Sequence, residues 1–349
     1  MPRRCPLPAR NPLLPGVLLL ALGMGAPALA DAPRVVVSIA PVHSLVAAVT
    51  GDVASPHLIV PPGQSPHTFS LAPSDARALA RADAVFTAGG ATDRFLERPL
   101  RTLADDAQHV SLLSAPGVRQ LPARSGGAWR DGHHRHEDED EDAHGHEDTR
   151  GQAENHGQGE NPGHDPDAHT EGASAGVDPH AWLDPRNAMA FVDTVAARLA
   201  DLDPARAERY RANAAATAER LAALDREIER ELAPLAERPY LVFHDAYQYF
   251  ERRYRLAAAG SVVVDPGRPP GARRLSELRD RIRREGIECL FVEPQFEPRI
   301  AQSIAEGTGV RIGELDPLGA GLQTGTKLYP ELLERLADAL RDCLDARTP

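Results

Sequence analysis

The sequence contains little cysteine, and no long apolar run follows its first 30 residues. It has three cysteines in 349 residues, and Cys5 lies in the leader described below, which leaves Cys289 and Cys343. Two cysteines in an exported chain usually form a disulfide, although two buried free thiols also fit the sequence. Their wide separation excludes a CxxC metal or redox motif.

The chain also lacks the signatures of several enzyme and nucleic-acid-binding classes. It contains no HExxH motif, nucleophile elbow or P-loop, and the Gly89-Gly90 turn lacks the GxGxxG spacing. No basic stripe is present that could replace the counterions on phosphate, so a nucleic-acid partner is not expected. These absences favour a binding protein over an enzyme.

The first 30 residues are typical of a secretory signal peptide. Three arginines precede a short apolar run at 13–22, and Ala28-Leu29-Ala30 gives the small-x-small pattern of a cleavage site. The run is shorter than the about 20 apolar residues that a membrane span requires. We therefore expect cleavage before Asp31 and an exported, soluble, monomeric chain.

The formal net charge of −12 arises in one segment of the chain. Residues 131–171 hold 14 acidic side chains against Arg135 and Arg150. The stretch from about 126 to 176 has almost no large apolar residue, so it cannot bury enough surface to offset the entropy of ordering. We predict an unstructured insertion here. Its clustered imidazoles favour low-affinity metal binding, and they belong to His133, His134, His136, His144, His146, His156, His164 and His169.

Short apolar strands alternate with helices on both sides of this insertion. Such alternation predicts an α/β fold with two lobes, each with a parallel sheet covered by helices. In the first lobe we expect strands at 34–39, 57–60, 84–88 and 109–113 and helices at 44–50 and 74–82, the latter capped by Ser74. In the second we expect strands at 240–243, 262–264, 289–292 and 310–312 and helices at 246–254, 275–284, 301–306 and 329–344.

A long amphipathic helix is predicted between the two lobes. Asp184-Pro185 and Asp203-Pro204 each offer an N-cap followed by proline at the first helical position. The second of these begins a helix over 204–233, which would span about 45 Å and act as a stiff strut. The predicted divisions are a leader at 1–30, an N-terminal lobe at 31–199, a linker at 200–237 and a C-terminal lobe at 238–349.

Four polar residues lie in loops at or near the carboxyl ends of strands, where α/β sheets place ligands. They are His67, His180, His244 and Asp316. Three imidazoles and a carboxylate suit a borderline-soft divalent ion such as Zn²⁺. The other histidines outside the insertion flank short elements and are expected to be ordinary polar residues: His43, His57 and His109.

At these residues the chain resembles the zinc-binding, ZnuA-type members of the cluster A-I (cluster 9) family of ABC-importer solute-binding proteins. The resemblance covers essentially the whole chain after the leader, and the acidic insertion lies where this family carries one. The segments that carry the resemblance are PPGQSPHTFSLAPSDARAL (61–79), DPHAWLDP (178–185), FHDAYQYFERRY (243–254), EPQF (293–296) and ELDPLG (314–319).

The resemblance implies a periplasmic protein that holds Zn²⁺ in a cleft between two lobes and delivers it to an ABC-importer membrane permease. The implied ligands are His67, His180 and His244, with Asp316 as the carboxylate, and the implied disulfide joins Cys289 to Cys343. From its clustered imidazoles and carboxylates, we hypothesise that the insertion is a flexible scavenger that raises the local zinc concentration near the cleft or passes zinc inward.

Two details of the resemblance bear on the metal. Manganese-binding members typically have glutamate where this chain has His244, so the histidine favours zinc. Some zinc-binding members have a glutamate at the place of Pro66, and its absence leaves the fourth ligand open between Asp316 and water. Asp184 and Asp245 are candidates for the hydrogen bonds that would fix the imidazole tautomers.

Three other functions remain compatible with the sequence. A manganese-binding importer component is the nearest, and a metal-binding adhesin or storage protein is the next. A zinc hydrolase is also conceivable because three histidines with an open position describe a catalytic site, with Glu293 as the general base.

Overall fold

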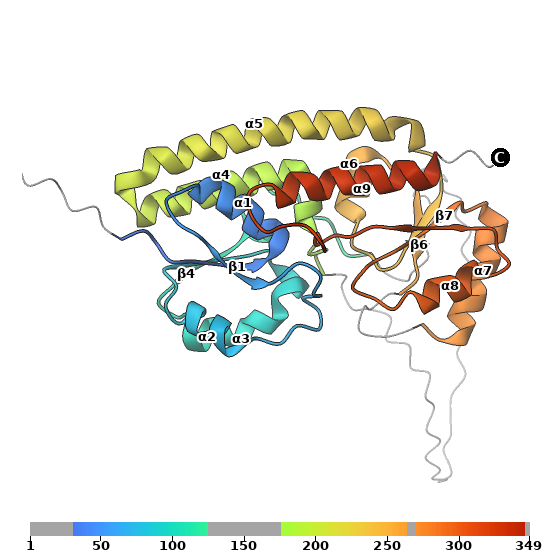
Figure 1. Cartoon of the computed structure of the whole chain (residues 1–349), viewed down its shortest axis with the longest axis horizontal. Coiled ribbons are helices and arrows are strands. Elements are labelled where there is room, and N and C mark those ends of the chain that lie inside the picture. The colour runs from blue at the N-terminus through green and yellow to red at the C-terminus, as the bar shows by residue number, and fades with distance from the viewer. Residues whose placement is uncertain (1–30, 125–175, 264–269, 346–349) are drawn as a thin grey trace, which may run out of the picture. The chain divides into compact units, whose positions relative to one another are not determined.

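Two parallel four-stranded sheets organise the chain. Figure 1 shows the helices and strands coloured along the sequence. The computed structural model describes residues 31–124, 176–263 and 270–345. The leader at 1–30 and the eight histidines of the insertion therefore lie outside the described residues. From Ala32 onward the chain forms one compact unit, so contacts between its two sheets can be compared directly.

The first sheet has the strand order β2-β1-β3-β4. All five residues of β1 are buried, which agrees with the apolar run that predicted this strand in the interior of a parallel sheet. The strands are Val35–Ile39 (β1), His57–Val60 (β2), Ala84–Thr87 (β3) and Gln108–Ser111 (β4).

The helices of the first lobe begin where proline allows them to begin. α1 starts four residues earlier than expected, with Pro41 in its first turn. The expected Ser74 cap of α2 is wrong, because α2 begins at Pro73 and the Asp75 carboxylate instead accepts a bond from the Ala72 N–H. Asp184 does cap α4, since its side chain accepts from the Arg186 N–H. The helices are Ala40–Thr50 (α1), Pro73–Leu79 (α2), Glu97–Leu103 (α3) and Pro185–Leu202 (α4).

The second sheet has the order β6-β5-β7-β8 and is also parallel. The strand expected at 262–264 is wrong in position, since β6 ends at Ser261 and pairs with β5 through less apolar residues; residue 264 lies outside the described residues. The elements of this lobe are Tyr240–Val242 (β5), Gln248–Tyr254 (α6), Ala258–Ser261 (β6), Ala272–Glu285 (α7), Cys289–Val292 (β7), Arg299–Ala305 (α8), Arg311–Glu314 (β8) and Leu328–Leu344 (α9).

A long helix joins the two sheets, which confirms the predicted strut. α5 covers Ala207–Leu232 and, with 26 residues, is about 39 Å long. Short 3₁₀ turns extend it at both ends, at Pro204–Arg206 and Ala233–Leu235. Asp203 stands at the N-cap position of the first turn, directly before Pro204, and its carboxylate accepts bonds from the side chains of Arg206 and Tyr210.

α9 provides a second connection that the sequence did not predict. At its start, the Tyr329 N–H donates to Ser44 Oγ of α1 (3.0 Å), and the Tyr329 hydroxyl donates to the Trp182 carbonyl (2.6 Å). Along its length it packs beside α5, as Figure 1 shows (red helix). A helix of the second lobe therefore begins against the first.

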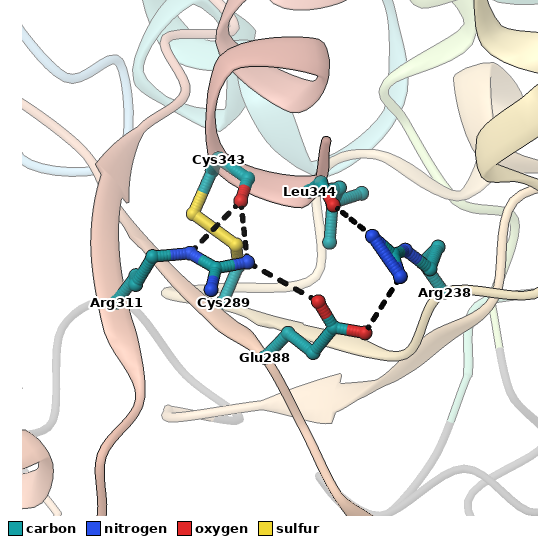
Figure 2. The surroundings of a disulfide bond; sticks show 6 residues. All are labelled: Arg238, Glu288, Cys289, Arg311, Cys343 and Leu344. Carbon is teal, nitrogen blue, oxygen red and sulfur yellow. Dashed lines mark hydrogen bonds and ion pairs between the residues drawn. A yellow bond between two sulfur atoms is a disulfide. The ribbon is translucent and has the colours of Figure 1, made fainter. Parts of the chain in front are cut away.

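A disulfide fixes the far end of α9 to the second sheet. Cys343 of α9 is bonded to Cys289, the first residue of β7, as Figure 2 shows. Beside it, the Arg311 guanidinium donates to the Cys343 carbonyl and to Glu288. The pairing implied by the family resemblance is therefore present.

Most buried apolar residues form one continuous core that includes parts of both sheets. A smaller cluster fills the space between β5, β7 and the helices α7 and α8. Among the described residues, no helix combines the length and apolar character that a bilayer crossing requires.

Candidate metal centre

Three histidines from distant parts of the chain meet in one place. His67 lies in the loop after β2, His180 precedes the 3₁₀ turn Ala181–Leu183, and His244 follows β5. Their ring centroids are 5.4 to 6.1 Å apart, and one candidate ligand nitrogen of each lies within 4.8 Å of the others. The structure therefore brings together the three imidazoles that the sequence singled out.

His180 is held by a carboxylate two residues before it. Asp178 Oδ1 accepts bonds from the His180 backbone N–H (2.9 Å) and from its Nδ1 (2.8 Å). Because a carboxylate can only accept, the proton of the neutral ring lies on Nδ1 and the Nε2 lone pair is left for a ligand. The Tyr249 hydroxyl donates to the Asp178 carbonyl (3.0 Å), which ties this loop to α6.

His244 is held by Glu293, which follows the neighbouring strand β7. Since β5 and β7 are adjacent and parallel, the residues after them emerge at the same sheet edge. His244 Nδ1 donates to Glu293 Oε1 at 2.5 Å. Among the described residues His244 Nε2 has no hydrogen-bond partner although it is buried. An orphaned imidazole nitrogen of this kind fits a metal ligand.

The residues around His244 change the pKa of its ring. Burial alone would lower its pKa, but the negative charge of Glu293 and the hydrogen bond to it outweigh that effect, so the pKa of His244 is raised from 6.5. A proton therefore competes for this ring above the pH at which a free histidine titrates.

The two carboxylates that were expected to hydrogen-bond to the histidine rings, Asp184 and Asp245, do not do so. Asp184 is used as the cap of α4. Asp245 points to Arg124, which forms an ion pair with Asp245 and with the buried Glu251. The carboxylates that hold the rings are Asp178 and Glu293, which lie in the motifs DPH and EPQF. Both motifs are visible in the sequence, but neither acid was predicted to hold a histidine ring.

Asp316 is not among the residues gathered at the three rings. Its Oδ1 accepts bonds from Gln295 Nε2 (2.7 Å) and from the Leu318 N–H (2.9 Å), and its Oδ2 accepts one from the Ala320 N–H. Gln295 itself lines the space beside the histidines. Gln295 therefore lies between the Asp316 carboxylate and the three histidines.

Aromatic side chains pack against the buried rings of His180 and His244, whereas His67 is exposed. Trp182 lies 5.2 Å from the His180 ring, and Phe296 lies 5.7 Å from the His244 ring. Trp182 Nε1 donates to the Pro317 carbonyl of the second lobe (2.9 Å). About 10 Å³ remains for a water-sized sphere, roughly the room for one water or ion.

The other histidines that the structure describes have partners elsewhere, as expected. His43 contacts the Pro56 carbonyl, His57 contacts Asp75 and His109 contacts Thr87. Burial lowers the pKa of His43 and of His109.

Two α/β lobes, a long joining helix and histidines that meet between the sheets define a metal-binding solute-binding protein of the cluster A-I class. The family described as "ZnuA: Zinc-uptake complex component A periplasmic" matches residues 35–343. The chain belongs to this family, whose members are transport components and not enzymes.

Relatives and solved structures agree with the assignment. The chain is 44% identical over 316 residues to a high-affinity zinc uptake system protein ZnuA of Brucella abortus, covering 89% of this chain and 91% of the relative. It is 39% identical to the protein of the same description from Paracoccus denitrificans, covering 95% and 98%. A crystal structure of ZnuA superposes with a TM-score of 0.68 at 25% identity, covering 90% of this chain and all of that one.

A structural likeness also exists to a laminin-binding adhesin of Streptococcus agalactiae. Its TM-score is 0.66 at 22% identity, covering 89% of this chain and 99% of that one. At this identity the likeness shows the fold alone.

Proposed function

We propose that this chain captures Zn²⁺ in the periplasm and delivers it to the membrane permease of an ABC importer. The observation that supports this most strongly is the meeting of His67, His180 and His244, together with a buried Nε2 on His244 that has no partner in the described part of the chain. Relatives at 44% and 39% identity are described as high-affinity zinc uptake proteins. Zinc is thus the transported substrate, and export would depend on the leader at 1–30.

Three neutral imidazoles suit Zn²⁺, which binds histidine nitrogen at about 2.0 Å in tetrahedral sites. The fourth position is to be taken by water or by Asp316, which would have to exchange its bonds to Gln295 and to backbone N–H groups for the metal. Water needs no such exchange and is the simpler proposal.

The lobes provide a means of signalling occupancy. His67 and His180 belong to the first lobe and His244 follows a strand of the second, so metal bound to all three couples their positions. A permease that contacts both lobes would distinguish the loaded from the empty protein.

Native mass spectrometry with a zinc and manganese titration tests the proposal. The full chain is expected to keep one zinc ion under conditions that remove weakly bound ions. His244→Glu is expected to lose zinc affinity by about tenfold or more and to gain relative preference for manganese. A variant that binds zinc as tightly as the parent would contradict the assignment of His244.

We also propose that the histidines of the insertion bind zinc weakly and raise its concentration near the cleft. Deletion of residues 132–170 is expected to lower metal stoichiometry at high zinc and to slow growth at limiting zinc. Unchanged stoichiometry and growth would exclude the scavenging role.

The competing functions have less support. Glu293, the acid considered as a hydrolytic base, is occupied by His244 Nδ1. For an adhesin, the discriminating measurement is growth at limiting zinc, which needs an importer component and not an adhesin. Ester hydrolysis by the zinc-loaded protein but not by the metal-free protein would favour the hydrolase.

A further inference from the structure

A groove of about 500 Å³ lies where α1, α5 and α9 meet. Its walls are largely apolar and include Leu45 of α1, Leu221 and Leu224 of α5 and Pro330 of α9. None of these residues lines the metal centre. The volume lies within the range of pockets that bind small organic ligands.

Charged residues stand at the rim of this groove in a regular order. α5 contributes Arg220 and, seven residues later, Glu227. Lys327, the N-cap residue of α9, is followed seven residues later by Glu334 of that helix. Seven residues are two helical turns, so each pair lies on one side of its helix, with about 10.5 Å between cation and acid along the axis.

The two helices run in the same direction, which aligns these pairs. Glu231 near the end of α5 forms an ion pair with Arg341 near the end of α9 (3.2 Å). The start of α9 contacts Ser44 of α1, and α1 in turn meets the earlier part of α5, where Asn213 donates to the Val49 carbonyl. Both cations therefore gather at one end of the groove and both acids at the other.

Within the described part of the chain, no ion pair joins Lys327, Glu227 or Glu334 to another residue. Burial and the charges of Glu331 and Glu227 raise the pKa of Glu334. The acidic end thus carries negative charge that a bound cation would offset. Arg220 donates to the Thr217 hydroxyl and keeps its charge at the other end.

We propose that this groove binds a short, apolar, peptide-like zwitterion, with its carboxylate at Arg220 and Lys327 and its ammonium at Glu227 and Glu334. An extended tripeptide spans about 10 Å, which matches the separation of the charged ends. The apolar walls of the groove would contact the side chains of the peptide between its two charged ends. This site is separate from the metal centre and does not depend on the proposed transport function.

Isothermal titration calorimetry of the full chain with the tripeptide Leu-Ala-Leu tests the proposal. We expect a Kd on the order of 0.1 mM. The N-acetyl and C-amide forms of the peptide should each bind about three- to tenfold more weakly, because each lacks one of the two charges.

Two variants assign the ends of the ligand. Lys327→Met should weaken binding of the parent peptide and leave binding of the C-amide unchanged, whereas Glu334→Gln should weaken the parent and leave the N-acetyl form unchanged. Arg198→Met, an exposed change on α4, is the matched control and should alter none of them. Equal binding of all three peptides, or no heat at millimolar peptide, would overturn the proposal.

A second measurement needs no variant. Lys327 is the only lysine of the sequence, so acylation with the reagent in large excess over the peptide amines, followed by mass spectrometry of the fragment that contains Lys327, reports on the groove. Leu-Ala-Leu is expected to slow acylation of Lys327 more than its C-amide does. Equal protection by both peptides would also contradict the proposal.

Discussion

The carboxylates behind His180 and His244 determine which nitrogen of each ring can meet a metal. Asp178 and Glu293 each accept from Nδ1, so Nε2 is the nitrogen that remains on both rings. Burial would lower the pKa of His244, but the charge of Glu293 and the hydrogen bond to it raise this pKa overall. Protons therefore compete with zinc for His244 at a higher pH than they would for a free histidine.

This competition predicts a pH dependence of zinc binding. A protonated imidazole cannot coordinate, so affinity is complete above the raised pKa of His244 and falls as the pH decreases through it. The decline should begin above pH 6.5 and approach about tenfold per pH unit for each competing ring. Competition titrations against a chelating indicator between pH 8 and pH 5 measure it; a constant affinity down to pH 6 would contradict it.

Glu293→Gln keeps a hydrogen-bond acceptor but removes the negative charge beside His244. Zinc affinity should fall by about 10- to 100-fold. The pH midpoint should move down, since the charge that raises the pKa of His244 is lost. Glu297→Gln, an exposed change four residues away, is the control and should shift neither quantity. A purely structural role of Glu293 would lower affinity without moving the midpoint.

At the scale of elements, the disulfide and the metal centre lie at opposite ends of strand β7. Cys289 begins the strand with the disulfide, and Glu293 follows its last residue at the metal centre. The bond between Cys289 and Cys343 closes a loop with a sequence separation of 54 residues. It constrains the unfolded chain and leaves the carboxyl end of the strand to the site.

We predict that removal of this disulfide lowers the stability of the protein and leaves the metal centre intact. The double variant Cys289→Ser, Cys343→Ser should lower the free energy of unfolding by roughly 4 kcal/mol. Denaturant titration of the metal-free protein measures this, with the parent protein under reducing conditions as the control. Zinc stoichiometry should stay at one for the cleft. An unchanged unfolding midpoint would contradict the prediction.

Strand positions could be predicted where the local sequence determines them. They could not be predicted where pairing with a neighbouring strand determines them. β7 matches its expectation to the residue because the apolar run Cys289–Val292 is followed directly by Glu293 and Pro294. β6 does not, because its position is set by pairing with β5 and the apolar residues 262–264 follow it. α3 was missed because none of its residues is buried, so no apolar stripe marks it.

In the candidate site, the three histidines could be predicted from the sequence, but their carboxylate partners could not. The three histidines lie in recognisable loop motifs, and the structure gathers them. Their partners depend on tertiary structure: Glu293 is 49 residues from His244, while the adjacent Asp245 is drawn to Arg124. Sequence proximity therefore pointed to the wrong acid.

In the whole molecule, a few buried hydrogen bonds connect the lobes around the metal centre. Trp182 donates to the Pro317 carbonyl, and Tyr329 donates to the Trp182 carbonyl. The Tyr249 hydroxyl accepts from the Leu121 N–H and donates to the Asp178 carbonyl. The loop that holds His180 is thus positioned from the second lobe.

Tyr249→Phe tests this positioning. It leaves two buried backbone groups without a partner, so the free energy of unfolding should fall by about 1–3 kcal/mol, and zinc affinity should fall several-fold with it. Tyr254→Phe is the matched control: its hydroxyl donates to Asp225 of α5, away from the site. It should lose stability and keep its zinc affinity. An equal loss of zinc affinity in both variants would assign the effect to stability alone.

The most direct test of the account is X-ray absorption spectroscopy of the protein loaded with one zinc ion. The meeting of His67, His180 and His244 predicts three imidazole nitrogens at about 2.0 Å and one oxygen ligand. His67→Ala should remove one imidazole from that shell. A parent spectrum with fewer than three imidazoles, or one that His67→Ala leaves unchanged, would contradict it.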